Sequence, residues 1–108
     1  MSWAWIYLIA AGVFEIGWPL GLKMSQFVEG KQLTGIAIAV FSMALSGFLL
    51  YQAQKDIPMG TAYAVWTGIG AAGTFVMGIL FYGDPIGTLR ILSVLLIIAG
   101  VVGLKLAH

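Results

Sequence analysis

The sequence predicts an all-α integral membrane protein with four short transmembrane helices, which form a single domain over residues 1–108. Composition is the first observation behind this class. Of all residues, 61% are hydrophobic and only 8% are charged, against roughly 25% charged residues in soluble domains, and the mean hydropathy is +1.04. Spacing is the second observation, because charges interrupt the chain at nearly the interval of about 20 residues that one membrane span needs.

The composition also excludes several classes of protein. A net charge of +1 provides no basic patch for nucleic acid and no polybasic tail for anionic lipid. The chain has no cysteine and its only histidine is His108, which excludes disulfides, thiol catalysis and a histidine metal cluster. No nucleophile has a base partner, and no phosphate-binding glycine loop of an ATPase occurs. We therefore expect no enzyme activity, no cofactor and no metal site.

The first span, expected over about residues 3–22, contains one charge, Glu15. This residue lies mid-span, about 18 Å along the helix from Trp3 at 1.5 Å per residue. An ionisable group at that depth costs free energy and indicates a functional site. A carboxyl group there can hold either a proton or a cation. The alternative is a protonated glutamic acid that hydrogen-bonds a neighbouring helix.

The neighbours of Glu15 support a site on the first span. Gly12 shares its helix face and leaves space beside it, and Trp18 follows it by three residues. Pro19 follows by four and lacks the N–H that would bond the Glu15 carbonyl, so the sequence predicts a kink there. The alternative for Pro19 is a mild bend without function.

The second span, expected over about residues 33–54, contains no charge. Ser42 and Ser46 lie four residues apart and so share one helix face. Either hydroxyl can hold the Glu15 carboxyl or a ligand N–H. The alternative is that each hydroxyl bonds the backbone of its own helix.

The third span, expected over about residues 60–82, places the rings of Tyr63 and Trp66 on one face. Such rings can meet a cation and also supply polar groups, although an aromatic belt at the membrane interface is the alternative. Three glycines, Gly68, Gly70 and Gly73, favour a hinge or a close helix crossing.

The fourth span, expected over about residues 87–105, begins near Arg90, whose side chain can reach the membrane interface. Ala99, Gly100 and Gly103 are small and suit close helix–helix contact in lipid. We expect this helix to pack against a partner and not to bind the transported ion.

The charges leave the orientation of the chain open. Lys55 and Lys105 belong to the side of the termini, and Lys23, Lys31 and Arg90 to the other. This near balance is either noise in a small protein or a sign that the chain inserts both ways. Four helices do not easily enclose a polar pathway around Glu15, so a homodimer is the simplest assembly.

Four motifs stand out along the chain: Phe14-Glu15-Ile16-Gly17-Trp18, Gly21-Leu22-Lys23, the segment 60–71 (GTAYAVWTGIGA) and Gly103-Leu104-Lys105. Together they resemble the motifs of the small multidrug resistance transporters, and within that family those of the guanidinium-exporter subtype. The resemblance covers essentially the whole chain. It implies an antiparallel, dual-topology homodimer, multi-pass in the bacterial inner membrane.

The resemblance also implies a proton-coupled antiporter that exports guanidinium-like cations. Protons and substrate would compete for Glu15 of both subunits, in a site completed by Trp18, Ser46, Tyr63 and Trp66. Gly12 would be the small residue near the carboxylates. The alternatives are a broader exporter of quaternary ammonium cations and a non-transporting assembly subunit.

One residue departs from the family's pattern. A small residue such as alanine is expected where this chain has Pro19. The hypothesis that follows is a wider site that accepts bulkier guanidines.

Overall fold

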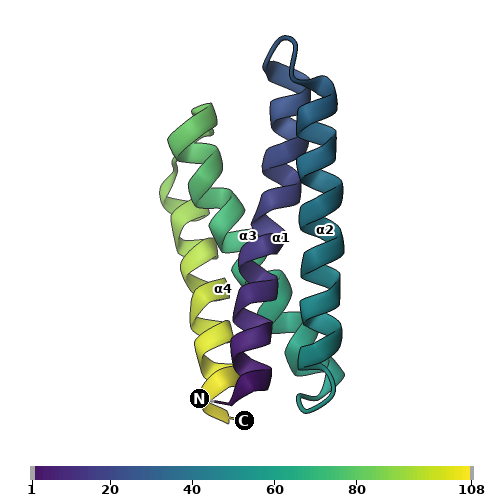
Figure 1. The fold of residues 1–108 in the computed structure, drawn as a ribbon. Helices are drawn as coiled ribbons and strands as arrows, with labels where there is room; N and C mark the ends of the chain where they lie inside the picture. The colour runs from purple at the N-terminus through teal and green to yellow at the C-terminus, as the bar shows by residue number, and fades with distance from the viewer. Residues whose placement is uncertain (1, 108) are drawn as a thin grey trace.

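The computed structural model describes residues 2–107, so that Met1 and His108 lie outside the described residues. It contains four α-helices: α1 (Trp3–Phe27), α2 (Gln32–Ala53), α3 (Met59–Tyr82) and α4 (Thr88–Ala107) (Figure 1). Each is long and apolar enough to cross a membrane, since a helix of 20 residues spans about 30 Å, the thickness of the hydrocarbon layer. The prediction of an all-α, four-helix membrane protein is confirmed.

The helices end at residues that suit a chain reversal. The loop after α1 contains Gly30 at a φ of +79°, and α3 ends at Gly83, whose φ is +65°. A positive φ is the conformation that glycine adopts without strain. Pro58 precedes α3 directly, and Pro85 lies in the connection to α4. The first helix is longer than the expected span, since it ends at Phe27 and not at residue 22.

The three connections between helices lie at the two ends of the bundle. Both termini lie at one end together with the connection 54–58, and the connections 28–31 and 83–87 lie at the other (Figure 1). Helices α1 and α2 run side by side, and α3 crosses α1 obliquely. At the backbone level α4 adjoins α3 alone among the helices of residues 2–107. This order leaves α4 at the edge of the bundle.

The core is small and lies toward the end that holds the termini. Its buried side chains come from α1, the end of α2, the connection 54–58 and the start of α3, and they include Trp5, Leu8, Ile57 and Val65. No residue of α4 is buried, and large apolar side chains are exposed on all four helices. Such a surface requires lipid or another protein around it.

Candidate functional site

Glu15 lies beside a cavity between α1 and α3. The cavity has a volume of about 260 Å³, and Glu15, Trp18 and Pro19 line it from α1. The lining residues of α3 are Thr67, Gly70, Ala71 and Thr74. Glu15 lies half-way along α1, and its side chain is half-buried. No basic side chain among residues 2–107 forms an ion pair with it, which leaves its charge available to a cation or a proton.

Trp18 holds one oxygen of that carboxyl group. The indole Nε1–H donates a hydrogen bond to Oε1 of Glu15 from one turn along the same helix. A carboxylate has about four acceptor positions, so this bond orients the group and leaves the other positions free. The sequence placed these two residues on one helix face, and the structure brings them together.

Gly70 allows α3 to approach the carboxylate closely. A Cβ atom at this position would overlap Cγ of Glu15, and one at Gly73 would overlap Cδ1 of Ile16. At Gly68 the overlap would be with Val101 of α4. The three glycines thus lie at close helix contacts, which is one of the two roles predicted for them. The hinge role stays a prediction.

Ser46 and Trp66 form a second polar connection that joins three helices. Trp66 Nε1–H donates to Ser46 Oγ at 2.8 Å, and Ser46 Oγ–H donates to the backbone oxygen of Ala11 at 2.6 Å. Ser46 is almost fully buried. In an α-helix the carbonyl of Ala11 also accepts the N–H of Glu15, so this connection fixes the turn that presents Glu15. It does not reach the carboxyl group itself.

Three further predicted site residues, Gly12, Ser42 and Tyr63, do not line the Glu15 cavity. Gly12 packs against Ile69, where an added Cβ would come within 2.7 Å of two of its atoms. Ser42 Oγ lies 2.5 Å from the position that a Cβ of Gly17 would occupy, and Ser42 lines a separate groove on α2. Tyr63 is exposed, with its ring centroid 5.5 Å from that of Trp66.

Pro19 lies inside α1, which continues as one helix to Phe27. Its ring lines the Glu15 cavity and also a second cavity further along α1. The predicted kink at this position stays a prediction. The proline is nevertheless part of the wall of the Glu15 cavity.

Sequence reasoning missed two hydroxyl-bearing residues of the cavity. Thr67 and Thr74 lie on the face of α3 that meets Glu15, together with Gly70 and Ala71. Positions 67, 70, 71 and 74 repeat at the three- and four-residue spacing of one helix face. That spacing was available in the sequence and could have identified both threonines once Gly70 was placed on the site.

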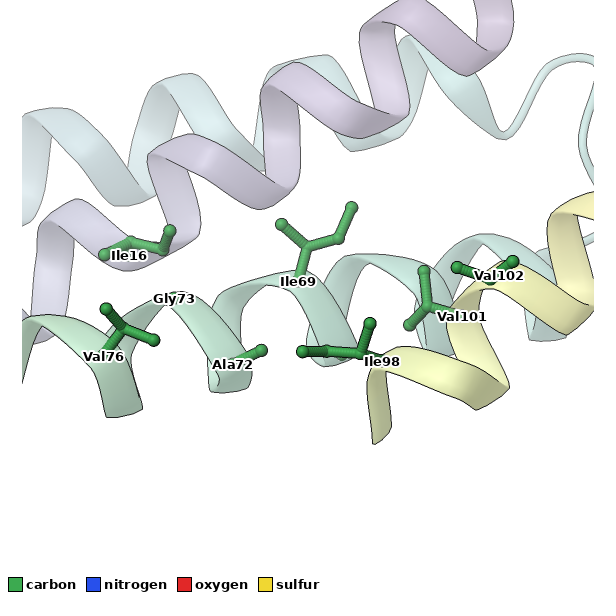
Figure 2. A pocket seen from close by; sticks show the side chains of 9 residues that line it. Ile16, Ile69, Ala72, Gly73, Val76, Ile98, Val101 and Val102 are labelled. Carbon is green, nitrogen blue, oxygen red and sulfur yellow. The ribbon is translucent and has the colours of Figure 1, made fainter. Parts of the chain in front are cut away.

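A larger cavity of about 340 Å³ lies between α1, α3 and α4, and it is almost wholly apolar. Figure 2 shows its lining, which α1, α3 and α4 supply: Ile16, Ile69, Ala72, Gly73, Val76, Ile98, Val101 and Val102. A desolvated cation needs charged or hydrogen-bonding partners, which this lining lacks. The Glu15 cavity is therefore the better candidate for a cation.

The described residues provide no other ionic site in the membrane. Among residues 2–107, no three histidine, cysteine, aspartate or glutamate side chains gather where a metal ion could bind.

Ala99, Gly100 and Gly103 are exposed on α4, and a Cβ at Gly100 or Gly103 would meet no atom within 4 Å. Their small side chains leave an open surface for a partner helix.

The sequence matches the family model for the small multidrug resistance protein over residues 3–97. The chain belongs to the small multidrug resistance family. It is 52% identical over 104 residues to the guanidinium exporter of Yersinia pseudotuberculosis, covering 96% of this chain and 98% of the relative. It is 46% identical to the guanidinium exporter of Salmonella typhimurium and 45% identical to that of Escherichia coli K12, each over 105 residues, 96% of this chain and 97% of the relative.

Membership of the small multidrug resistance family settles the class of the protein. It is a multi-pass protein of the bacterial inner membrane, and its activity is transport and not enzymatic catalysis. The resemblance inferred from the motifs is confirmed.

Proposed function

We propose that the protein exports guanidinium and small guanidinyl cations in exchange for protons, with Glu15 of both subunits as the shared binding site. The observation that carries this proposal is the Glu15 carboxylate, held by Trp18 in a cavity at mid-span. The relatives at 45–52% identity that are named guanidinium exporters support the choice of substrate.

The chemistry of the cavity suits a planar cation with several donors. Guanidinium can meet a carboxylate through two parallel N–H···O bonds, and the Trp18 indole limits how the carboxylate turns. A lipophilic quaternary ammonium ion has no N–H donor and would favour a looser, apolar pocket. The cavity instead combines one carboxylate with the hydroxyl-bearing Thr67 and Thr74.

Competition for one carboxylate would couple the two ions. Glu15 holds a proton or a guanidinium ion but not both, so the arrival of one requires the departure of the other. A proton from outside would replace guanidinium on Glu15 and would be released into the cytoplasm, where the next guanidinium ion binds. A proton gradient directed into the cell would therefore drive export. In this scheme the KM for guanidinium rises as the pH falls, because protons occupy the same site.

A second copy of the chain would complete the site. The Glu15 cavity is open in the single chain, and α4 buries none of its residues. Two antiparallel copies would enclose both carboxylates and pack α4 against α4 through Ala99, Gly100 and Gly103. Small residues of this kind allow helices to approach closely in lipid. Ser46, Trp66 and Tyr63 would then position and gate the pair of carboxylates.

The test is transport by the purified protein in proteoliposomes, with wild type beside Glu15→Gln. Guanidinium and tetrapropylammonium are offered in turn against a proton gradient, while internal pH is recorded. We expect guanidinium to move protons in wild type and the flux of the variant to fall to that of empty liposomes. Asp56→Asn, which removes a carboxylate from a connection between helices, serves as the matched control and should transport normally.

Two results would count against the proposal. Equal flux of tetrapropylammonium and guanidinium would favour the broader cation exporter over the guanidinium-selective one. Full guanidinium flux in Glu15→Gln would remove the carboxylate from the mechanism altogether.

A further inference from the structure

We propose that the Asp84 carboxylate is a loading site for the cation, at the outer end of a groove of two adjacent cavities that lie along α1 and α3 beside Glu15. The inference rests on the proposed function, because it assumes that a cation reaches Glu15. It adds a residue outside the membrane-spanning segments to the path of that cation.

Two cavities make up this groove. The Glu15 cavity and a smaller one of about 140 Å³ share Pro19 of α1 and Thr74 of α3 as lining residues. The smaller cavity is further lined by Leu20, Lys23, Gly78, Tyr82 and Asp84. Going from Glu15 toward Asp84, the lining therefore passes from mid-span to the end of the bundle that holds the connections 28–31 and 83–87.

The backbone fixes the Asp84 carboxylate over this cavity. Gly83 ends α3 in the left-handed conformation, and Asp84 N–H then donates to the carbonyl of Gly78 at 3.1 Å. This turn folds the side chain back along α3. A Cβ at Gly78 would overlap Asp84 Oδ2, so the glycine leaves the space in which the carboxylate lies against the helix.

The negative charge of Asp84 is not neutralised by the bases near it. Lys23 also lines the cavity, but its Nζ lies 4.4 Å from the centre of the Phe27 ring. Arg90 donates from Nε to the carbonyl of Pro85, and its guanidinium carbon lies 5.1 Å from the centre of the Phe75 ring. Within residues 2–107 neither base forms an ion pair with Asp84, so the carboxylate can attract a cation.

A site of this kind should bind weakly. Transport requires each station to hold the ion well enough to admit it and loosely enough to release it. Asp84 is half-buried at the end of the bundle, where an ion pair contributes only about 0–1 kcal/mol. Lys23 on the opposite wall of the cavity limits the affinity further. In an antiparallel pair, one such groove would open to each face of the membrane.

The test is the KM for guanidinium in proteoliposomes, measured for wild type, Asp84→Asn and Asp84→Glu. At about 0.01 M salt, where the Debye length is about 30 Å, we expect Asp84→Asn to raise KM about two- to fivefold with the maximal rate retained. At about 1 M salt, where the Debye length is about 3 Å, the difference should disappear. Asp84→Glu should restore the wild-type KM.

Glu29→Gln is the matched control, because Glu29 lies in the other connection at the same end of the bundle and does not line the groove. It should leave KM unchanged. Wild-type KM values in Asp84→Asn at both salt concentrations would overturn the proposal. So would a lower maximal rate with an unchanged, salt-independent KM, since that result indicates only a structural role. Wild-type liposomes that fail to exchange guanidinium for protons would instead overturn the proposed function.

Discussion

A few polar side chains define the chemistry of this membrane domain, and each has a partner that fixes it. Trp18 donates to the Glu15 carboxylate, and Trp66 donates to Ser46, which in turn bonds the backbone of Ala11. A polar group in lipid without a partner costs several kcal/mol. These hydrogen bonds therefore hold in place the turn that bears Glu15, and they leave other acceptor positions of its carboxyl group free.

Replacing Trp18 by phenylalanine should reduce selectivity for guanidinium. The change keeps the ring but removes the N–H that donates to Glu15, and a hydrogen bond to a charged group contributes about 1.5–3 kcal/mol. We expect the ratio of guanidinium flux to tetrapropylammonium flux to fall about tenfold, because the carboxylate is no longer held in one orientation. Trp3→Phe, at the exposed start of α1, is the control. An unchanged ratio in Trp18→Phe would show that the indole N–H does not set selectivity.

The sequence reveals the residues of this site unevenly. Glu15 and Trp18 could be paired in advance, because a charge at mid-span is rare and a spacing of three residues places two side chains on one helix face. The hydrogen-bond partner of Ser46 could not be predicted from the sequence, since its hydroxyl bonds a backbone carbonyl 35 positions away. That choice depends on the register of α2 against α1, which the helical spacing within either segment leaves open.

At the scale of helices, glycine determines how near α3 comes to α1. Positions 70 and 73 bring the α3 backbone against Glu15 and Ile16, and position 68 brings it against α4. The number of spans could be read from the spacing of charges. The contact partners of each glycine could not be predicted from the sequence, because a hinge and a close helix crossing have the same glycine pattern. Helix ends were also uncertain, since α1 continues past the first span to Phe27.

Replacing Gly70 by alanine should impair the site through packing alone. The added methyl group would overlap the Glu15 side chain, and overpacking costs about 1–3 kcal/mol. We expect guanidinium binding to weaken about tenfold, as measured by calorimetry in detergent. Gly47→Ala is the matched control, because a Cβ there meets no atom within 4 Å. Equal affinity in the two variants would mean that α3 moves away from Glu15 without cost.

At the scale of the whole molecule, one chain leaves two surfaces uncovered. Its cavity at Glu15 is open, and α4 is exposed along its length. Charge does not favour either orientation strongly. Lys23, Lys31 and Arg90 lie in or near the connections 28–31 and 83–87, and Lys55 and Lys105 lie in the connection 54–58 and near the end of α4. Insertion in both orientations would supply both halves of an antiparallel pair from one sequence, and each end of the pair would then carry the charges of both ends of the chain.

Fixing the orientation should therefore abolish transport, and restoring the pair should recover it. The variant Lys55→Ser/Lys105→Ser keeps positive charge mainly at the 28–31 end, and Lys31→Ser/Arg90→Ser keeps it mainly at the end of the termini. Positive ends stay in the cytoplasm. A C-terminal tag on the wild-type protein should therefore be labelled from both sides of the membrane. The tag on each variant should be labelled from one side only, and that side should differ between the two variants. We expect neither variant to transport alone and co-expression to restore guanidinium flux. Transport by either singly oriented variant would show that an antiparallel partner is not required.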